Sequence, residues 1–325
     1  MAVELGRKGW IGVAKETTAG VPVTPADYIP YVASSLQGKH EPIADVAAYG
    51  IRDEQSENST VGQKHGEGTV ELNMDATNVG YFMLAAMGTQ ANNAEGGGVI
   101  THTFSRNNSN TPQSLSLTFD KSVSSSRELF TYATVSTLEL SYSTDNEFAK
   151  CSAEILSKFP VTTTSGTLTT TSGSLLSFKN AQLQLGASLT AAESATPTKV
   201  TNFSVTINNN SDMHWRDGDN DVSFVDVKNF MVEGEIDLFF ENVTERDNYY
   251  NLTKRSAIIT LTGNGIGNLM SEFVKVRIAK MSYRDFEVET GIDDLFATTI
   301  TFTGEYSSTD TKTMDLQLRN RKASY

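Results

Sequence analysis

A short phrase of this chain occurs twice, at a separation of about half its length. The phrase EGTVEL at 67–72 returns as EGEIDL at 233–238, 166 positions later in a chain of 325 residues. Each copy leads into a short helix-like stretch and then into alternating strand segments, so the repeated unit has the size of a domain. Two similar domains in one chain can imitate a pair of identical subunits, and the repeat therefore points to a protein that assembles.

Composition and charge are those of an ordinary globular chain. Hydrophobic residues make up 38% and charged residues 20%, which is enough apolar material for two modest cores. The net charge of -13 divides into -7 over residues 1–165 and -6 over 166–325, so neither half resembles a basic nucleic-acid clamp. Cys151 is the only cysteine, which excludes an intrachain disulfide. Neither a long apolar run nor a signal-peptide pattern is present, and we expect the chain to be made and kept in a cytoplasm.

The segment with the least apolar material for a core lies at the midpoint of the chain. Residues 162–174, TTTSGTLTTTSGS, are nearly all Thr, Ser and Gly, a composition typical of a linker or an exposed hairpin. We therefore predict a first domain over 1–161, a linker over 162–174 and a second domain over 175–325. A second weak segment, 89–113, predicts a long loop or small hairpin in the first domain, with almost no counterpart in the second.

Most of the remaining sequence alternates with period two. In 137–143 the even positions are apolar and the odd positions polar, as in a strand with one face on a core and the other in water. Strands of the same kind are predicted at 114–119, 203–207, 257–261 and 299–302. The sequence thus predicts a mainly β fold of two tandem β-sandwich-like or barrel-like domains, each with one flanking α-helix.

One helix is predicted after each copy of the phrase. The first spans 78–87, with Asn78 as its cap and Gly88 as its stop. The second spans 244–255, with Thr244 as its cap, acids in its first turn and bases in its last. Aromatic and leucine side chains on both helices are expected in the cores. These are Tyr81, Phe82, Leu84, Tyr249, Tyr250 and Leu252.

The sequence carries no recognisable catalytic or cofactor motif. None of its four histidines stands at metal-ligand spacing from another. Asp217, Asp219 and Asp221 alternate as in a calcium loop, but Val222 and Lys228 stand where an EF-hand loop needs Gly and Glu. We interpret this segment as a solvated turn or an acidic docking loop. The sequence predicts neither an enzyme nor a bound cofactor or metal.

Two stretches carry a resemblance to a known family. The opening GWIGVAKETTAGVPVTPADYIPY and the later GEGTVELNMDATNVGYFMLAAMG resemble the major tail tube proteins of long, non-contractile bacteriophage tails. The opening is similar to that of members in which a tube domain is duplicated. The resemblance extends from Trp10 to the last strand. The 89–113 insertion and the basic tail at 319–322 depart from the family pattern.

The resemblance implies a structural virion protein of the tail. Six domains of such proteins form a ring whose inner sheets join into one barrel, so three of these chains would complete a ring. Rings stack into a tube through which double-stranded DNA passes without specific binding. The implied partners are further copies of the chain together with tape-measure, tail-tip and tail-terminator proteins, and no membrane is implied.

Two sets of residues are candidates for roles in such a tube. Glu71, Glu139 and Asp237 lie on the polar phase of their strands, and either a lumen wall or a solvated outer face fits them. In the family a long loop reaches a neighbouring subunit or ring, and 43–63 and 208–229 are the candidates here. Their apolar anchors are Ile51, Met213, Trp215 and Phe224.

Two other classes of function share parts of this pattern. A carbohydrate-binding β-sandwich of a virion or cell surface would have the same strands and Thr-rich composition, but it would cluster aromatic platforms on its loops. Only Trp215 is so placed. A hydrolase would need a nucleophile or paired acids in a pocket, and no motif supports one.

Overall fold

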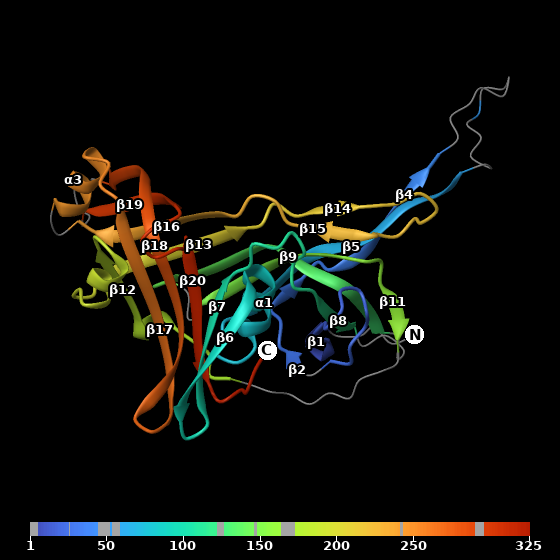
Figure 1. The fold of residues 1–325 in the computed structure, drawn as a ribbon, viewed down its shortest axis with the longest axis horizontal. Coiled ribbons are helices and arrows are strands. Elements are labelled where there is room, and N and C mark those ends of the chain that lie inside the picture. Colours follow the sequence, from blue (N-terminus) through green and yellow to red (C-terminus); the bar gives the residue numbers. More distant parts are fainter. Residues whose placement is uncertain are drawn as a thin grey trace.

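The computed structural model describes residues 6–25, 27–44, 53, 59–121, 127–145, 148–163, 173–240, 243–289 and 296–325. Strands account for 59% of it and helices for 10%, which confirms the prediction of a mainly β protein. The two halves of the chain lie side by side along the long axis, as the colours of Figure 1 show.

The strands of the first half begin after a single 3-10 turn, η1 (Gly6–Lys8). They are β1 (Trp10–Lys15), β2 (Asp27–Ile29), β3 (Ala33–Ser34), β4 (Gln37–Ile43), β5 (Thr60–Asn73), β6 (Gly88–Gly96), β7 (Val99–Arg106), β8 (Leu115–Asp120), β9 (Arg127–Ser143), β10 (Lys150–Ser157) and β11 (Val161–Thr163). One helix, α1 (Val79–Met87), lies between β5 and β6.

The second half opens with another 3-10 turn, η2 (Phe178–Asn180). Its strands are β12 (Ala181–Gly186), β13 (Val200–Asn208), β14 (Asp212–His214), β15 (Phe224–Asp226), β16 (Met231–Phe239), β17 (Arg255–Gly267), β18 (Met270–Glu289), β19 (Ala297–Gly304) and β20 (Met314–Asn320). Its helices are α2 (Leu189–Glu193) and α3 (Thr244–Tyr250).

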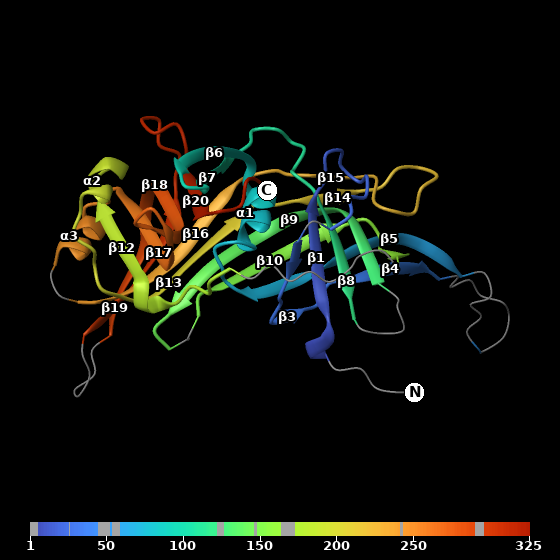
Figure 2. The ribbon, with the colours of Figure 1, turned by 90° about the horizontal axis from the view of Figure 1, so that it is seen from below.

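One antiparallel sheet, called the front sheet below, runs through both halves. Its strand order is β4-β5-β10-β9 from the first half, followed by β13-β16-β19-β18 from the second. The two sets of four follow the same order of chain segments, and β9 pairs with β13 where they meet. β5, β10, β9 and β13 lie side by side in Figure 2.

A second layer of strands covers the back of each half. In the first half it is β2-β1-β8, which continues into the start of β9 and then β11. In the second half it is β12-β17, which continues into the start of β18 and then β20. The long strands β9 and β18 therefore belong to both layers of their sandwich. Fully buried phenylalanines fill the space between the layers: Phe82, Phe104, Phe130, Phe203 and Phe302.

The two halves share a β-bulge at equivalent positions of their long strands. The pairing of β9 with β10 shifts by one residue between Thr137 and Val135. The pairing of β18 with β19 shifts in the same way between Asp285 and Tyr283. A bulge at equivalent points of equivalent strands is a designed feature of a fold. The prediction of two tandem β-sandwich units, each with a flanking helix, is confirmed.

The first predicted helix is confirmed. Every residue of α1 is buried, Tyr81, Phe82 and Leu84 among them, as expected for a helix that is apolar all round. Asn78 precedes the helix, and Gly88 ends it in the left-handed region at a φ of 90°.

The second predicted helix is shorter than its pattern suggested. α3 ends at Tyr250, its capping position is Val243 rather than Thr244, and its last turn holds no base. Tyr250 and Leu252 are 69% and 75% exposed, so their prediction as core residues was wrong. Leu252 adopts a φ of 51°, in the left-handed region, which is incompatible with a continuing right-handed helix.

The insertion in the first half forms the hairpin of β6 and β7, as the sequence predicted. β7 then pairs with β20, so the hairpin extends the back layer of the second half rather than its own (Figure 1). Of the predicted linker, Thr162 and Thr163 belong to β11, and residues 164–172 lie outside the described part of the chain.

A buried carboxylate ties the opening segment to the bend of β9. Glu16 is 2% exposed. Its Oε1 accepts hydrogen bonds from Ser116 Oγ at 2.9 Å and from the Tyr132 N–H at 2.9 Å. Its Oε2 accepts from Ser114 Oγ at 2.7 Å and from the Gly20 N–H at 2.7 Å. Tyr132 adopts a φ of 53°, so this carboxylate holds β9 in a conformation that non-glycine residues rarely adopt.

We expect Glu16→Gln to lower the free energy of unfolding by about 2–3 kcal/mol, because the amide nitrogen cannot accept two of the four hydrogen bonds. Urea denaturation measures the change. Glu71→Gln, on an exposed strand position, is the matched control and should stay within about 0.5 kcal/mol of the wild type. Equal effects of the two substitutions would contradict this role of Glu16.

Candidate functional site: the polar face and free edges of the front sheet

The front sheet has one apolar and one polar face. In β9, Leu138 and Leu140 are buried against the back layer, whereas Thr137 and Glu139 alternate with them and face outward. β5 and β16 show the same alternation, with Glu71 and Asp237 in the outward phase. The polar face therefore extends across the join between the two halves.

The structure brings the three candidate lumen residues onto this one face. Ser152 of β10 lies directly opposite both Glu71 and Glu139, which places these carboxylates two strands apart in one row. Asp237 lies in a separate row in the second half, opposite Asn202 of β13 and Thr299 of β19. Its carboxylate accepts hydrogen bonds from Asn202 Nδ2 at 3.1 Å and from Thr299 Oγ1 at 2.7 Å.

Acidic side chains outnumber basic ones on the polar face. The acids are Glu67, Glu71, Glu139, Glu154, Glu233, Glu235, Asp237, Asp285 and Glu287, and the bases are Lys39, Lys150 and Arg284. Partial burial, with the nearby Asp237 charge second, raises the pKa of Glu235. A hydrogen bond from Lys39 lowers the pKa of Glu67. The face is thus a negatively charged surface with local compensation near β4.

The front sheet ends in two free edges. Among the described residues, β4 pairs with β5 alone, and residues 282–289 of β18 pair with β19 alone. The two end strands do not pair with each other in the described part of the chain, so a single copy leaves the sheet open. Free edges of this length are templates for further strand pairing.

The segment 208–229 packs onto the first half of its own chain. Trp215 is half-buried, and its Nε1–H donates to the Lys64 carbonyl at 3.3 Å. Its ring packs edge-on against the His65 ring, with 6.0 Å between the ring centroids. The backbone N–H of Lys64 donates in turn to the Asn220 carbonyl at 2.7 Å. Of the candidate loop anchors, Trp215 therefore reaches the neighbouring half.

The other candidate anchors lie elsewhere. Met213, half-buried, pairs with Val225 between β14 and β15. Phe224 is 36% exposed and stacks on His214 at 4.6 Å within the same segment. Ile51 lies outside the described residues.

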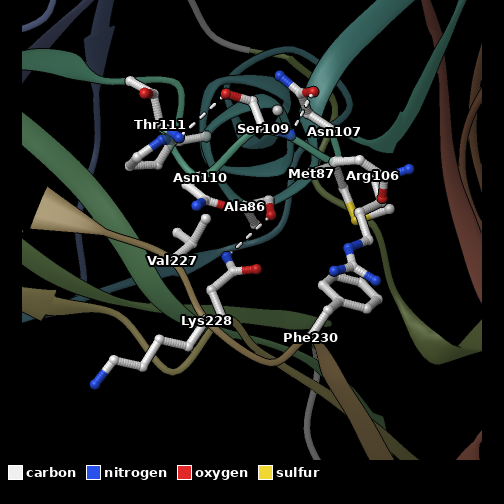
Figure 3. A pocket seen from close by; sticks show the side chains of 15 residues that line it. Ala86, Met87, Arg106, Asn107, Ser109, Asn110, Thr111, Val227, Lys228 and Phe230 are labelled. Carbon is white, nitrogen blue, oxygen red and sulfur yellow. Dashed lines mark hydrogen bonds between the residues drawn. The ribbon is translucent and has the colours of Figure 1, made fainter.

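The two ends of this segment lie near α1 and the loop that follows β7, with Asn209 at its start and Phe230 directly after it. Asn209 Nδ2 donates to the Ala86 carbonyl at 3.0 Å and to the Val135 carbonyl at 3.1 Å. Arg106 lies over the Phe230 ring at 5.0 Å from its centroid. Figure 3 shows Ala86, Arg106 and Phe230 at a pocket, which backbone, Asn, Ser and Thr groups line for the most part. The pocket lies between residues of the two halves. Its lining residues include no nucleophile paired with a base.

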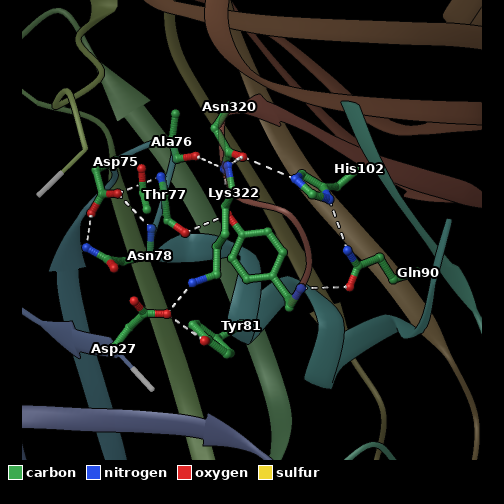
Figure 4. A network of polar contacts seen from close by, with 11 residues as sticks. Asp27, Asp75, Ala76, Thr77, Asn78, Tyr81, Gln90, His102, Asn320 and Lys322 are labelled. Atoms are coloured by element: carbon green, nitrogen blue, oxygen red, sulfur yellow. Dashed lines mark hydrogen bonds and ion pairs between the residues drawn. The ribbon is translucent and has the colours of Figure 1, made fainter. Parts of the chain in front are cut away.

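The basic tail, residues 319–325, binds the first half of the chain, which the sequence analysis did not predict. Asn320 Nδ2 donates to the Ala76 carbonyl at 2.7 Å, and Tyr325 OH donates to the Thr77 carbonyl at 2.6 Å. Lys322 forms an ion pair with Asp27 (Figure 4). A Cβ on Gly80 would stand 2.4 Å from the Tyr325 ring, so the glycine lets the ring rest on α1. No local sequence signal could have linked residues separated by most of the chain.

Metal binding has no support among the described residues. No group of three or more His, Cys, Asp or Glu side chains among them could hold a metal ion. Asp221, from the calcium-like segment, instead accepts the Phe159 N–H at 2.8 Å, as an acidic docking loop would. No helix in the described part of the chain has the length and apolarity needed to span a membrane.

Comparison with protein families matches residues 6–304 to the family described as phage tail tube protein. The chain belongs to this family. No curated protein sequence matches the chain. A phage tail tube protein is a structural component of the virion tail and not a member of an enzyme class, and the family implies self-assembly into a tube.

We expect Trp215→Ala to loosen the 208–229 segment from the first half, because the ring packing and the hydrogen bond to Lys64 are both lost. Hydrogen exchange of the Lys64 amide should rise about tenfold, the equivalent of about 1.4 kcal/mol of local stability. Trp215→Phe keeps most of the packing and serves as the control, with a smaller rise. An unchanged Lys64 exchange rate in Trp215→Ala would show that Trp215 does not secure the segment.

Proposed function

We propose that three copies of this tail tube protein form a closed ring, that the rings stack into the tail tube, and that double-stranded DNA passes through the bore without specific binding. Residues 1–161 and 175–325 are the two tube domains, and 162–174 is the linker. Assembly takes place in the host cytoplasm, with tape-measure, tail-tip and tail-terminator proteins as further partners.

The observation that carries the proposal is the repeated strand order of the front sheet. Each half offers the same two edges, and the β9 to β13 pairing already joins one half to the next. The same contact made between chains is head-to-tail, and a head-to-tail contact closes into a ring when its rotation permits. Closure would leave no free edge in the sheet.

The dimensions of such a ring suit a duplex. Each chain supplies eight front-sheet strands, so three chains supply about 24. At ~4.8 Å spacing and ~40° tilt, the backbone diameter is roughly 48 Å, and inward side chains leave about 40 Å free. A DNA duplex about 20 Å across would pass.

The layering supports the polar face as the wall of the bore. The opposite face of the front sheet carries the back layers and α1, which need a larger circumference than the sheet itself. An inner wall rich in Glu71, Glu139 and Asp237 would repel the phosphate backbone, which carries one negative charge per ~1.7 Å of duplex.

The stoichiometry is tested by native mass measurement of detached rings and by the symmetry of tubes in electron micrographs. We expect three chains of 35.4 kDa per ring and pseudo-sixfold symmetry. Six chains per ring would require twelve domains around the bore and would contradict the proposal. Discrete monomers that bind glycans would favour a carbohydrate-binding role instead.

The lumen assignment is tested by charge reversal. We expect Glu71→Lys, Glu139→Lys and Asp237→Lys each to leave tubes intact and to slow DNA release in low salt. Each new cation can contact a phosphate and add about 0.9 to the salt slope of DNA affinity. Glu71→Gln, Glu139→Gln and Asp237→Asn are the matched controls and should leave release nearly unchanged. Lysine variants that abolish tubes, or that release DNA normally, would place these side chains elsewhere.

A further inference from the structure

The pairing of β9 with β13, which joins the two halves within one chain, provides a template for strand pairing between two chains. β9 and β13 pair from Ser143 opposite Asn202 to Thr137 opposite Asn208. Glu139 lies opposite Thr206 in this ladder. The free edges of the front sheet belong to the strands that correspond to these two, β18 to β9 and β4 to β13.

The ladders fix which residues correspond. Glu71 and Asp237 occupy the same place in the repeated phrase, and their partners on the next strand are Ser152 and Thr299. Across the following pairing, Ser152 lies opposite Glu139, and Thr299 lies opposite Glu287. Glu287 is therefore the counterpart of Glu139.

The other edge is aligned in the same way. Glu67 and Glu233 are equivalent in the repeated phrase. Gln37 lies opposite Glu67, and Thr206 lies opposite Glu233. Gln37 is therefore the counterpart of Thr206.

We propose that β18 of one chain pairs antiparallel with residues 35–39 of a second copy, with Glu287 directly opposite Gln37. This register rests on the ring of the proposed function and specifies its contacts. It sets Asp285 opposite Lys39 and Val288 opposite Leu36.

The chemistry of the two edges fits this register. Asp285 and Lys39 are opposite charges at directly facing positions, and Lys39 already pairs with Glu67 within its own chain. Val288 is 39% exposed and Leu36 is 1% exposed. Their counterparts, Leu140 and Val205, are both buried where the internal junction covers them. The second copy would cover Val288 in the same way.

The edge strand also limits the length of the pairing. β13 ends at Asn208, the counterpart of Lys39. Beyond Lys39, the pairing of β4 with β5 shifts between His40 and Pro42. Pro42 has no N–H to donate, and bulges with prolines end strand pairing. The usable edge therefore stops at the same place as its internal counterpart.

Disulfide formation between engineered cysteines tests the register. Full-length Gln37→Cys/Glu287→Cys should oxidise into covalent dimers and trimers on non-reducing gels, because facing residues of antiparallel strands have Cα atoms about 4.5–5.5 Å apart. Gln37 and Glu287 are both exposed, so folding should be unaffected. Cys151 is buried, and burial raises the pKa of its thiol, so the background reaction should be low.

Two double variants are matched controls. Lys39→Cys/Glu287→Cys is two residues out of register, and Gln37→Cys/Val288→Cys puts the thiols on opposite faces of the sheet. Both should give at least tenfold less covalent trimer. Rings in electron micrographs with preferential linkage of either control would overturn the register while leaving the ring intact. Absence of rings would contradict the proposed function and this inference together.

Charge reversal gives an independent measurement. Asp285→Lys faces Lys39 with a like charge at three junctions per ring, and we expect about a tenfold rise in the protein concentration needed for half-assembly. Asp285→Lys/Lys39→Asp should restore most of the loss. Glu154→Lys, on the same polar face but in the centre of the sheet, is the control for net charge. Failure of the double variant to recover assembly beyond either single variant would overturn the pairing of Asp285 with Lys39.

Discussion

The backbone hydrogen bonds at the edges of the front sheet are the constraint on which the rest of this structure depends. An edge strand exposes a row of N–H and C=O groups, and a protein must pair, cover or disrupt that row. This chain pairs one such edge internally, where β9 meets β13, whereas the outer edges of β4 and of residues 282–289 have no partner strand among the described residues. The sandwich layers, the long strands that run through both of them and the matched bulges recur in the two halves, so each half has its edge strands in the same order.

The internal junction is reinforced by contacts outside the front sheet. The hairpin of β6 and β7 adds to the back layer of the second half, the 208–229 segment lies against Lys64 and Phe159, and the tail places Tyr325 on α1. The hairpin of β6 and β7 and the C-terminal tail have no counterpart among the described residues of the other half, so the two halves are similar in topology but unequal in their surroundings. Beyond the strand pairing of the front sheet, the two sandwiches are therefore also joined by the hairpin, the 208–229 segment and the tail.

The local sequence pattern predicted the strands and the fold class, because a strand with one buried and one solvent-exposed face alternates apolar and polar residues. The same alternation assigned Glu71, Glu139 and Asp237 to the polar phase of their strands, and the front sheet brings all three onto one face. The end of α3 was misjudged, since the acids and bases of 244–255 fit a longer helix while Leu252 turns the chain out of it. The pairing of β7 with β20 and of Lys322 with Asp27 joins residues more than two hundred positions apart, and no short-range pattern encodes such contacts.

The covalent connection across the β9 to β13 junction changes how a ring would respond to protein concentration. Six separate domains would close a ring with a sixth-power dependence on concentration, whereas three double-length chains need only a third-power dependence. Half of the junctions are then formed during folding of a single chain, at an effective concentration set by tethering and not by the number of copies in the cell. In such a ring, folding of each chain would complete every second junction, and only the remaining junctions would require an encounter between chains.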